Sequence, residues 1–158
     1  MADSARLVSV VLLLAAFLAY GSWGIRTWTQ VDRGMVIDSL EKSETKRLAS
    51  TKFFDKMTAF AQATLAVLGA SWTLLIVQSS RMQLTRPGLV AFVLVNISLI
   101  SSLAVYNEGY DFIVGRIFYH QTFDLEAPFV VLVKDLQQVF FMIGCLGLVA
   151  VITNRRTV

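Results

Sequence analysis

Residues 129–152 read FVVLVKDLQQVFFMIGCLGLVAVI, and this stretch decides the fold. A helix needs about 20 mostly apolar residues to cross the hydrocarbon core of a bilayer, and this stretch supplies them. Three further stretches of the same character cover residues 7–25, 57–77 and 88–106. The sequence therefore predicts an all-α integral membrane protein, in which one four-transmembrane-helix bundle takes up residues 1–158 as a single domain.

The composition of the whole chain agrees with this assignment. Of the 158 residues, 56% are hydrophobic and 16% are charged, whereas soluble domains carry about 25% charged residues. One cysteine excludes an internal disulfide and one histidine excludes a site built on paired histidines, so we predict no metal and no cofactor. The net charge of +3 comes from basic residues beside the apolar stretches, so we predict the lipid bilayer as a partner and no nucleic acid.

The connection over residues 26–56 is polar, but it keeps apolar residues at near-helical spacing, namely Val36, Ile37, Leu40 and Leu48. The spacing predicts a helical juxtamembrane arm between the first and second spans. Ser43, Ser50 and Thr51 are alternative starting points for the helix that enters the second span.

The connection over residues 107–128 is acidic and aromatic. One helical face carries Tyr106, Tyr110, Ile113, Val114 and Ile117. This pattern predicts either an extension of the third span or a helix lying in the membrane interface. The turn over residues 78–87 is short and ends at Pro87, which suits the first turn of the third helix.

Small residues are spaced so that helices can approach closely. In the second span Ala59, Ala63, Ala66 and Ala70 follow one stripe, and the fourth span carries Gly144 and Gly147. Small residues favour close helix packing where no hydrophobic force draws helices together. Two interpretations stay open, which are packing within one bundle and a face for an identical or different subunit.

The fourth span also carries a polar cluster of Lys134, Asp135, Gln137 and Gln138. A Lys or Asp at the centre of a spanning helix costs about 2.5 to 3.5 kcal/mol, so one interpretation moves the hydrocarbon window to residues 133–152 and leaves the charges at the membrane edge. The alternative is an intramembrane polar or ion site, because ionisable groups within spans usually face protein or water.

Lys134 and Asp135 are predicted to need partners elsewhere, because adjacent helical residues point about 100° apart. The candidates are Glu108, Asp111 and Glu126 for Lys134, and Arg116 and Arg26 for Asp135. Gln62 in the second span and Asn96 in the third are candidates for hydrogen bonds between helices.

Four spans place both termini on one side of the membrane. The short segments on that side carry Arg6, Arg81, Arg86, Arg155 and Arg156. The positive-inside rule counts basic residues near span ends, so we predict cytoplasmic termini in a bacterial inner membrane.

The sequence shows no nucleotide loop, no metal-ligand set and no nucleophile beside a base. We expect a non-enzymatic subunit or partner in a homo- or hetero-oligomeric membrane assembly, acting through close helix packing. One alternative is an oligomeric ion channel or ion-coupled transporter lined by the fourth span. The other is an interfacial membrane enzyme that uses His120 with Glu108 or Asp111.

Overall fold

The computed structural model describes residues 2–30, 43–78, 82–118 and 127–157. This part of the chain forms four long helices, α1 (Ala2–Gln30), α2 (Ser43–Gln78), α3 (Arg86–Phe118) and α4 (Pro128–Thr153). Two short strands, β1 (Met82–Leu84) and β2 (Arg155–Thr157), accompany them. The helices contain apolar spans at Leu7–Gln30, Ser50–Ile76, Arg86–Gly115 and Pro128–Thr153, so the chain is an integral membrane protein with a four-helix bundle, as predicted.

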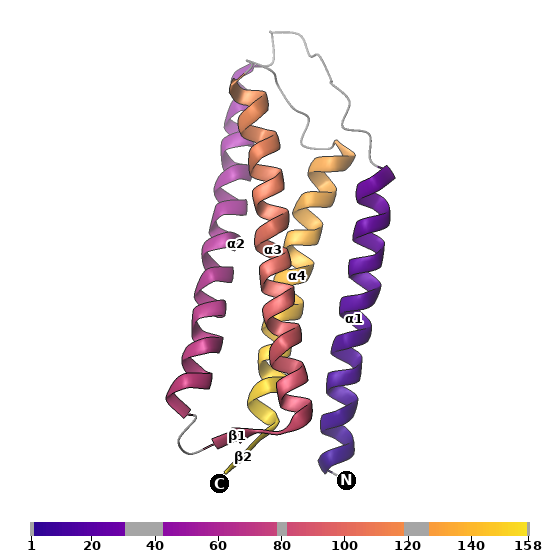
Figure 1. Ribbon diagram of the computed structural model, residues 1–158. Helices are drawn as coiled ribbons and strands as arrows, with labels where there is room; N and C mark the ends of the chain where they lie inside the picture. The colour runs from indigo at the N-terminus through magenta and orange to yellow at the C-terminus, as the bar shows by residue number, and fades with distance from the viewer. Residues whose placement is uncertain (1, 31–42, 79–81, 119–126, 158) are drawn as a thin grey trace.

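Helices α3 and α4 form the centre of the bundle, and α1 and α2 flank this pair on opposite sides (Figure 1). The central and the flanking helices differ in burial. In the most apolar segment of each helix, 44% of the residues are buried in α3 and in α4, against 17% in α1 and in α2. The flanking helices therefore present most of their surface to the bilayer.

Glycine allows the central pair to approach closely. A Cβ atom on Gly144 would lie 2.5 Å from Cδ2 of Leu99, and one on Gly147 would lie 2.6 Å from Cγ2 of Val95 and 3.0 Å from Cδ2 of Leu13. Real Cβ atoms essentially never lie less than 3.0 Å from another heavy atom, so neither position accepts a side chain without a shift of its neighbour on α3. The two glycines thus pack against α3 and α1 inside one chain.

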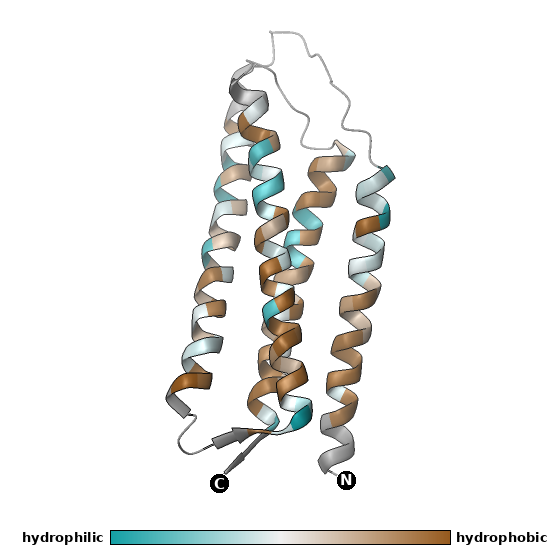
Figure 2. Ribbon diagram, in the orientation of Figure 1, coloured by the Kyte–Doolittle hydropathy of each residue, from teal (hydrophilic) through white to brown (hydrophobic). Residues whose placement is uncertain are grey.

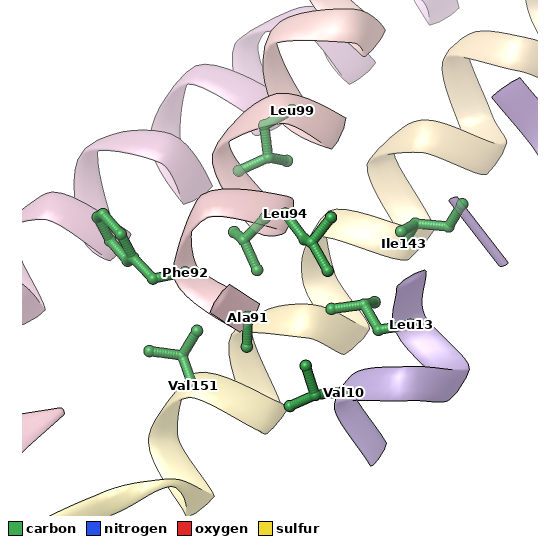
Figure 3. Close-up of a cluster of buried hydrophobic side chains, with 9 residues drawn as sticks. Val10, Leu13, Ala91, Phe92, Leu94, Leu99, Ile143 and Val151 are labelled. Carbon is green, nitrogen blue, oxygen red and sulfur yellow. The ribbon is translucent and has the colours of Figure 1, made fainter. Parts of the chain in front are cut away.

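A buried apolar cluster lies near the chain termini (Figure 3). The side chains that approach the two glycines, Leu13, Val95 and Leu99, belong to it. It takes Val10 and Leu13 from α1, residues of α3 that include Val95 and Leu99, and Ile143 and Val151 from α4. The buried members of this cluster therefore come from three helices, and only half-buried residues of α2 pack against it.

A second apolar cluster lies toward the other end of the helices. Its buried members are Met57, Ile113, Phe129, Val130 and Val133, and half-buried aromatic residues from α1, α2 and α3 pack on it. Because α3 has 33 residues, it is about 50 Å long and extends roughly 20 Å beyond a 30 Å hydrocarbon core. Polar residues become more frequent in the same direction (Figure 2).

The juxtamembrane elements are thus continuations of the spans. Helix α2 begins at Ser43, one of the predicted starts, and runs without interruption into the membrane. Helix α3 continues to Phe118, which confirms the extension of the third span and not the alternative of a separate interfacial helix for residues 107–118. The rest of the predicted arm, residues 31–42, and residues 119–126 lie outside the described residues.

The sequence did not predict the two strands. They pair antiparallel, with Leu84 opposite Arg155 and Met82 opposite Thr157. Beside them, the backbone N–H and the hydroxyl of Thr85 donate to the backbone carbonyl of Asn154, at 3.2 and 2.9 Å. Strands of three residues are too short to show an alternating pattern, so sequence periodicity gives no signal for them.

Candidate functional site

Gln137 joins three helices within the membrane. Its side chain is 1% exposed, and its Nε2 donates to the backbone carbonyl of Met57 on α2 at 3.0 Å. From α3, the hydroxyl of Ser102 donates to the backbone carbonyl of Gln137 at 2.9 Å. Of the four polar residues predicted on the fourth span, Gln137 is the one that the bundle encloses.

Other buried polar side chains in the spans were not predicted from the sequence. Thr64 and Ser71 on α2 are 0% and 2% exposed, and their hydroxyls donate to carbonyls of their own helix. Ser98 on α3 is fully buried, and no hydrogen bond to its hydroxyl is found in the described part of the chain. The spacing of seven residues between Thr64 and Ser71 was the available signal, because it places both on one helical face.

Lys134 and Asp135 pair with each other, which corrects the prediction that each needs a partner elsewhere. Lys134 Nζ lies 3.4 Å from Asp135 Oδ1, and the two side chains are 37% and 44% exposed. The lysine side chain has four carbons, so it is long enough to bring its ammonium group to the carboxylate of the adjacent residue.

Among the residues that the structure describes, no ion pair joins Lys134 or Asp135 to the predicted partners Glu108, Asp111 or Arg26. Glu108 and Asp111 are exposed on α3. Arg116 belongs to the last turns of α3. Gln138 is half-buried on α4. Glu126 and His120, the residue of the enzyme alternative, lie outside the described residues.

The described residues contain no cluster of three or more side chains suited to a metal ion. Cys145 is a free, half-buried thiol on α4. The prediction that Asn96 forms a hydrogen bond between helices is confirmed, because its Oδ1 accepts from Trp72 Nε1 at 2.9 Å.

The alanine stripe of the second span points away from its own bundle. Ala59, Ala66 and Ala70 are exposed, and Ala63 is half-buried. We use the term outer face of α2 for six exposed residues that share this side of the helix: Ala59, Gln62, Ala66, Gly69, Ala70 and Thr73. No heavy atom lies within 4 Å of a Cβ built on Gly69, so this face is open.

An apolar groove of about 530 Å³ lies on the opposite side of the molecule, between α1 and α3 with α4 behind it. The groove is lined by Gly21 on α1, by Ala104 on α3, and by Leu136 and Phe140 on α4. Glu108 is the one ionisable residue in the lining.

The chain matches no known protein family model, no curated protein and no solved structure.

Proposed function

We propose that this protein is a subunit of an oligomeric membrane assembly and binds a neighbouring transmembrane helix through the outer face of α2. The observation that carries the proposal is Gln62, a polar side chain exposed on an intramembrane surface that is otherwise made of small residues. An amide in hydrocarbon is stabilised by a hydrogen bond from another helix, which is worth about 0.6 kcal/mol on average.

The spacing of this face supports the proposal. Positions 59, 62, 66, 69 and 73 advance by alternating steps of three and four residues. This is the repeat of a helix seam that packs along its length against a second helix. Apart from Gln62, the side chains at these positions are small, so a neighbouring backbone can approach closely and gain dispersion contacts that lipid chains would not provide.

The test is crosslinking in native membranes from photoreactive residues at positions 62 and 66. Positions 97 and 149 serve as controls, since Ile97 and Val149 are 41% and 59% exposed on α3 and α4. We expect protein crosslinks from the first two positions only. Ala66→Leu should reduce them about tenfold, whereas Ala19→Leu, an exposed alanine of α1, should leave them unchanged. Crosslinks to lipid alone from all four positions would contradict the proposal.

The channel alternative has less support in the structure. The amide Nε2 of Gln137 is held by a backbone carbonyl, which reduces its capacity to contact a passing ion. The residues that follow Gln138 on α4 are apolar as far as Ile143. Assembly therefore accounts for more of the polar side chains than conduction does.

We also propose that both termini are cytoplasmic in a bacterial inner membrane. The start of α1 and the end of α4 lie at one end of the bundle, together with Arg86 and Arg155 (Figure 1). Basic residues close to span ends are retained on the cytoplasmic side. A green fluorescent protein fused after Val158 should fluoresce, and alkaline phosphatase at the same place should be inactive. Fusions after Gln30 should give the opposite results, and a reversed pattern would refute the orientation.

A further inference from the structure

The depth of the groove between α1 and α3 matches one leaflet of the bilayer. Counting from Leu7, where the apolar part of α1 begins, Phe17 lies about 15 Å and Trp28 about 32 Å along the helix axis. Counting from Arg86, Ser101 and Glu108 lie about 23 and 33 Å along α3. The hydrocarbon core is about 30 Å thick, so the groove extends from the bilayer midplane to the headgroups on the side far from the termini.

The walls of the groove suit a hydrocarbon chain. The aromatic rings of Phe17 and Phe140 lie at its deep end with centroids 6.0 Å apart. Gly21 has no heavy atom within 4 Å of a built Cβ, which leaves room between α1 and α3 for an added chain. A volume of about 530 Å³ falls within the usual range of binding sites for small molecules.

The shallow end of the groove carries charges of both signs. Glu108 lines the groove itself. Arg26 lines a hollow that adjoins it, since Ser22 and Ile25 border both. Neither charged side chain has an ion-pair partner among the residues that the structure describes. A carboxylate and a guanidinium therefore lie at headgroup level on this side of the bundle, and each can form charge-assisted hydrogen bonds.

We infer that the groove binds a zwitterionic phospholipid from the leaflet on this side of the membrane. One acyl chain lies against Gly21 and Ala104, the headgroup ammonium contacts Glu108, and the phosphate contacts Arg26. An anionic phospholipid without an ammonium group would place no positive charge beside Glu108. The site selects phosphatidylethanolamine over phosphatidylglycerol for this reason. This inference is independent of the outer face of α2, which lies on the other side of the bundle.

The experiment uses the full chain in nanodiscs that contain equal amounts of phosphatidylethanolamine and phosphatidylglycerol with the same acyl chains. Native mass spectrometry after release counts the lipids that stay bound. We expect the unmodified protein to retain phosphatidylethanolamine with about fivefold preference, the scale of one partly exposed ion pair. Glu108→Gln should remove the preference, and Asp111→Asn should keep it, because Asp111 is an exposed carboxylate of α3 outside the groove.

Filling the groove provides a second measurement. Ala104→Leu should reduce the retained phosphatidylethanolamine about tenfold, whereas Ala19→Leu, an exposed position of α1 that does not line the groove, should retain it fully. Circular dichroism of both variants checks that the helices are intact. The inference would be overturned by equal lipid retention in Ala104→Leu and Ala19→Leu, or by an unchanged lipid preference in Glu108→Gln. Crosslinks between copies of the protein from a photoreactive residue at position 21 would also overturn it. Loss of α2 crosslinking would leave these outcomes unaffected.

Discussion

Gly144→Leu and Gly147→Leu are each expected to lower the free energy of unfolding by about 1 to 3 kcal/mol, the usual cost of overpacking a close-packed interior. At Gly144 even the first added carbon would lie 2.8 Å from Cγ of Leu99, which is a branch point and not the mobile end of a side chain. At Gly147 the obstacle is Val95, whose β-branched side chain has one preferred rotamer in a helix. Both substitutions therefore push α4 away from α3.

The matched control is Gly115→Leu. Gly115 also lies in a helix, but no heavy atom comes within 4 Å of a Cβ built there, so the first added carbon meets no obstacle. It should leave stability unchanged or raise it slightly, because glycine is a poor helix former. Unfolding by sodium dodecyl sulfate in mixed micelles, followed by circular dichroism, measures all three variants. Equal midpoints for the three would show that α3 and α4 do not pack as described.

A compensating substitution makes the same prediction sharper. Leu99→Ala alone should cost about 2 to 5 kcal/mol, as expected for a large-to-small change at a fully buried position. Combined with Gly144→Leu, the loss should be smaller than the sum of the two single losses, because the new side chain occupies the space that Leu99 left. Residues in direct contact usually show such coupling at about 0.5 to 3 kcal/mol.

The sequence was sufficient to predict the spans, because long apolar stretches are recognised one at a time. It could not show which side of each helix faces the bundle. Leu99 is fully buried while Ile97 and Ile100 are 41% and 56% exposed, although all three are chemically alike. Hydrocarbon and protein interior are both apolar, so the pattern that identifies a buried face in water is absent in lipid.

The polar residues of α4 also show that the sequence does not reveal which side chains face the bundle. Gln137 and Gln138 are adjacent and identical, but one is enclosed and hydrogen-bonded while the other is half-buried. The prediction for Lys134 and Asp135 was wrong because it considered the direction of the Cα–Cβ bonds and not the reach of the lysine stem. The groove requires the placement of α1 beside α3, and hydropathy contains no information about which helices are neighbours.

Gln137→Ala is expected to lower the free energy of unfolding by about 2 to 4 kcal/mol. The substitution removes the hydrogen bond to the carbonyl of Met57 and leaves a cavity at a side chain that is 1% exposed. Gln137→Met separates the two effects, because methionine keeps nearly the same volume but cannot donate. It should cost only the hydrogen bond, about 0.6 to 1.7 kcal/mol.

The control for these variants is Gln138→Met, at a half-buried neighbour, which should change stability by less than about 0.5 kcal/mol. The variants Gln137→Ala, Gln137→Met and Gln138→Met also distinguish a packing role of Gln137 from a role in ion conduction. If Gln137 holds α2 against α4, Gln137→Met weakens the bundle and reconstituted vesicles show no ion flux that depends on it. If Gln137 lines an ion path, Gln137→Met changes flux at unchanged stability, and the channel alternative then replaces the assembly proposal.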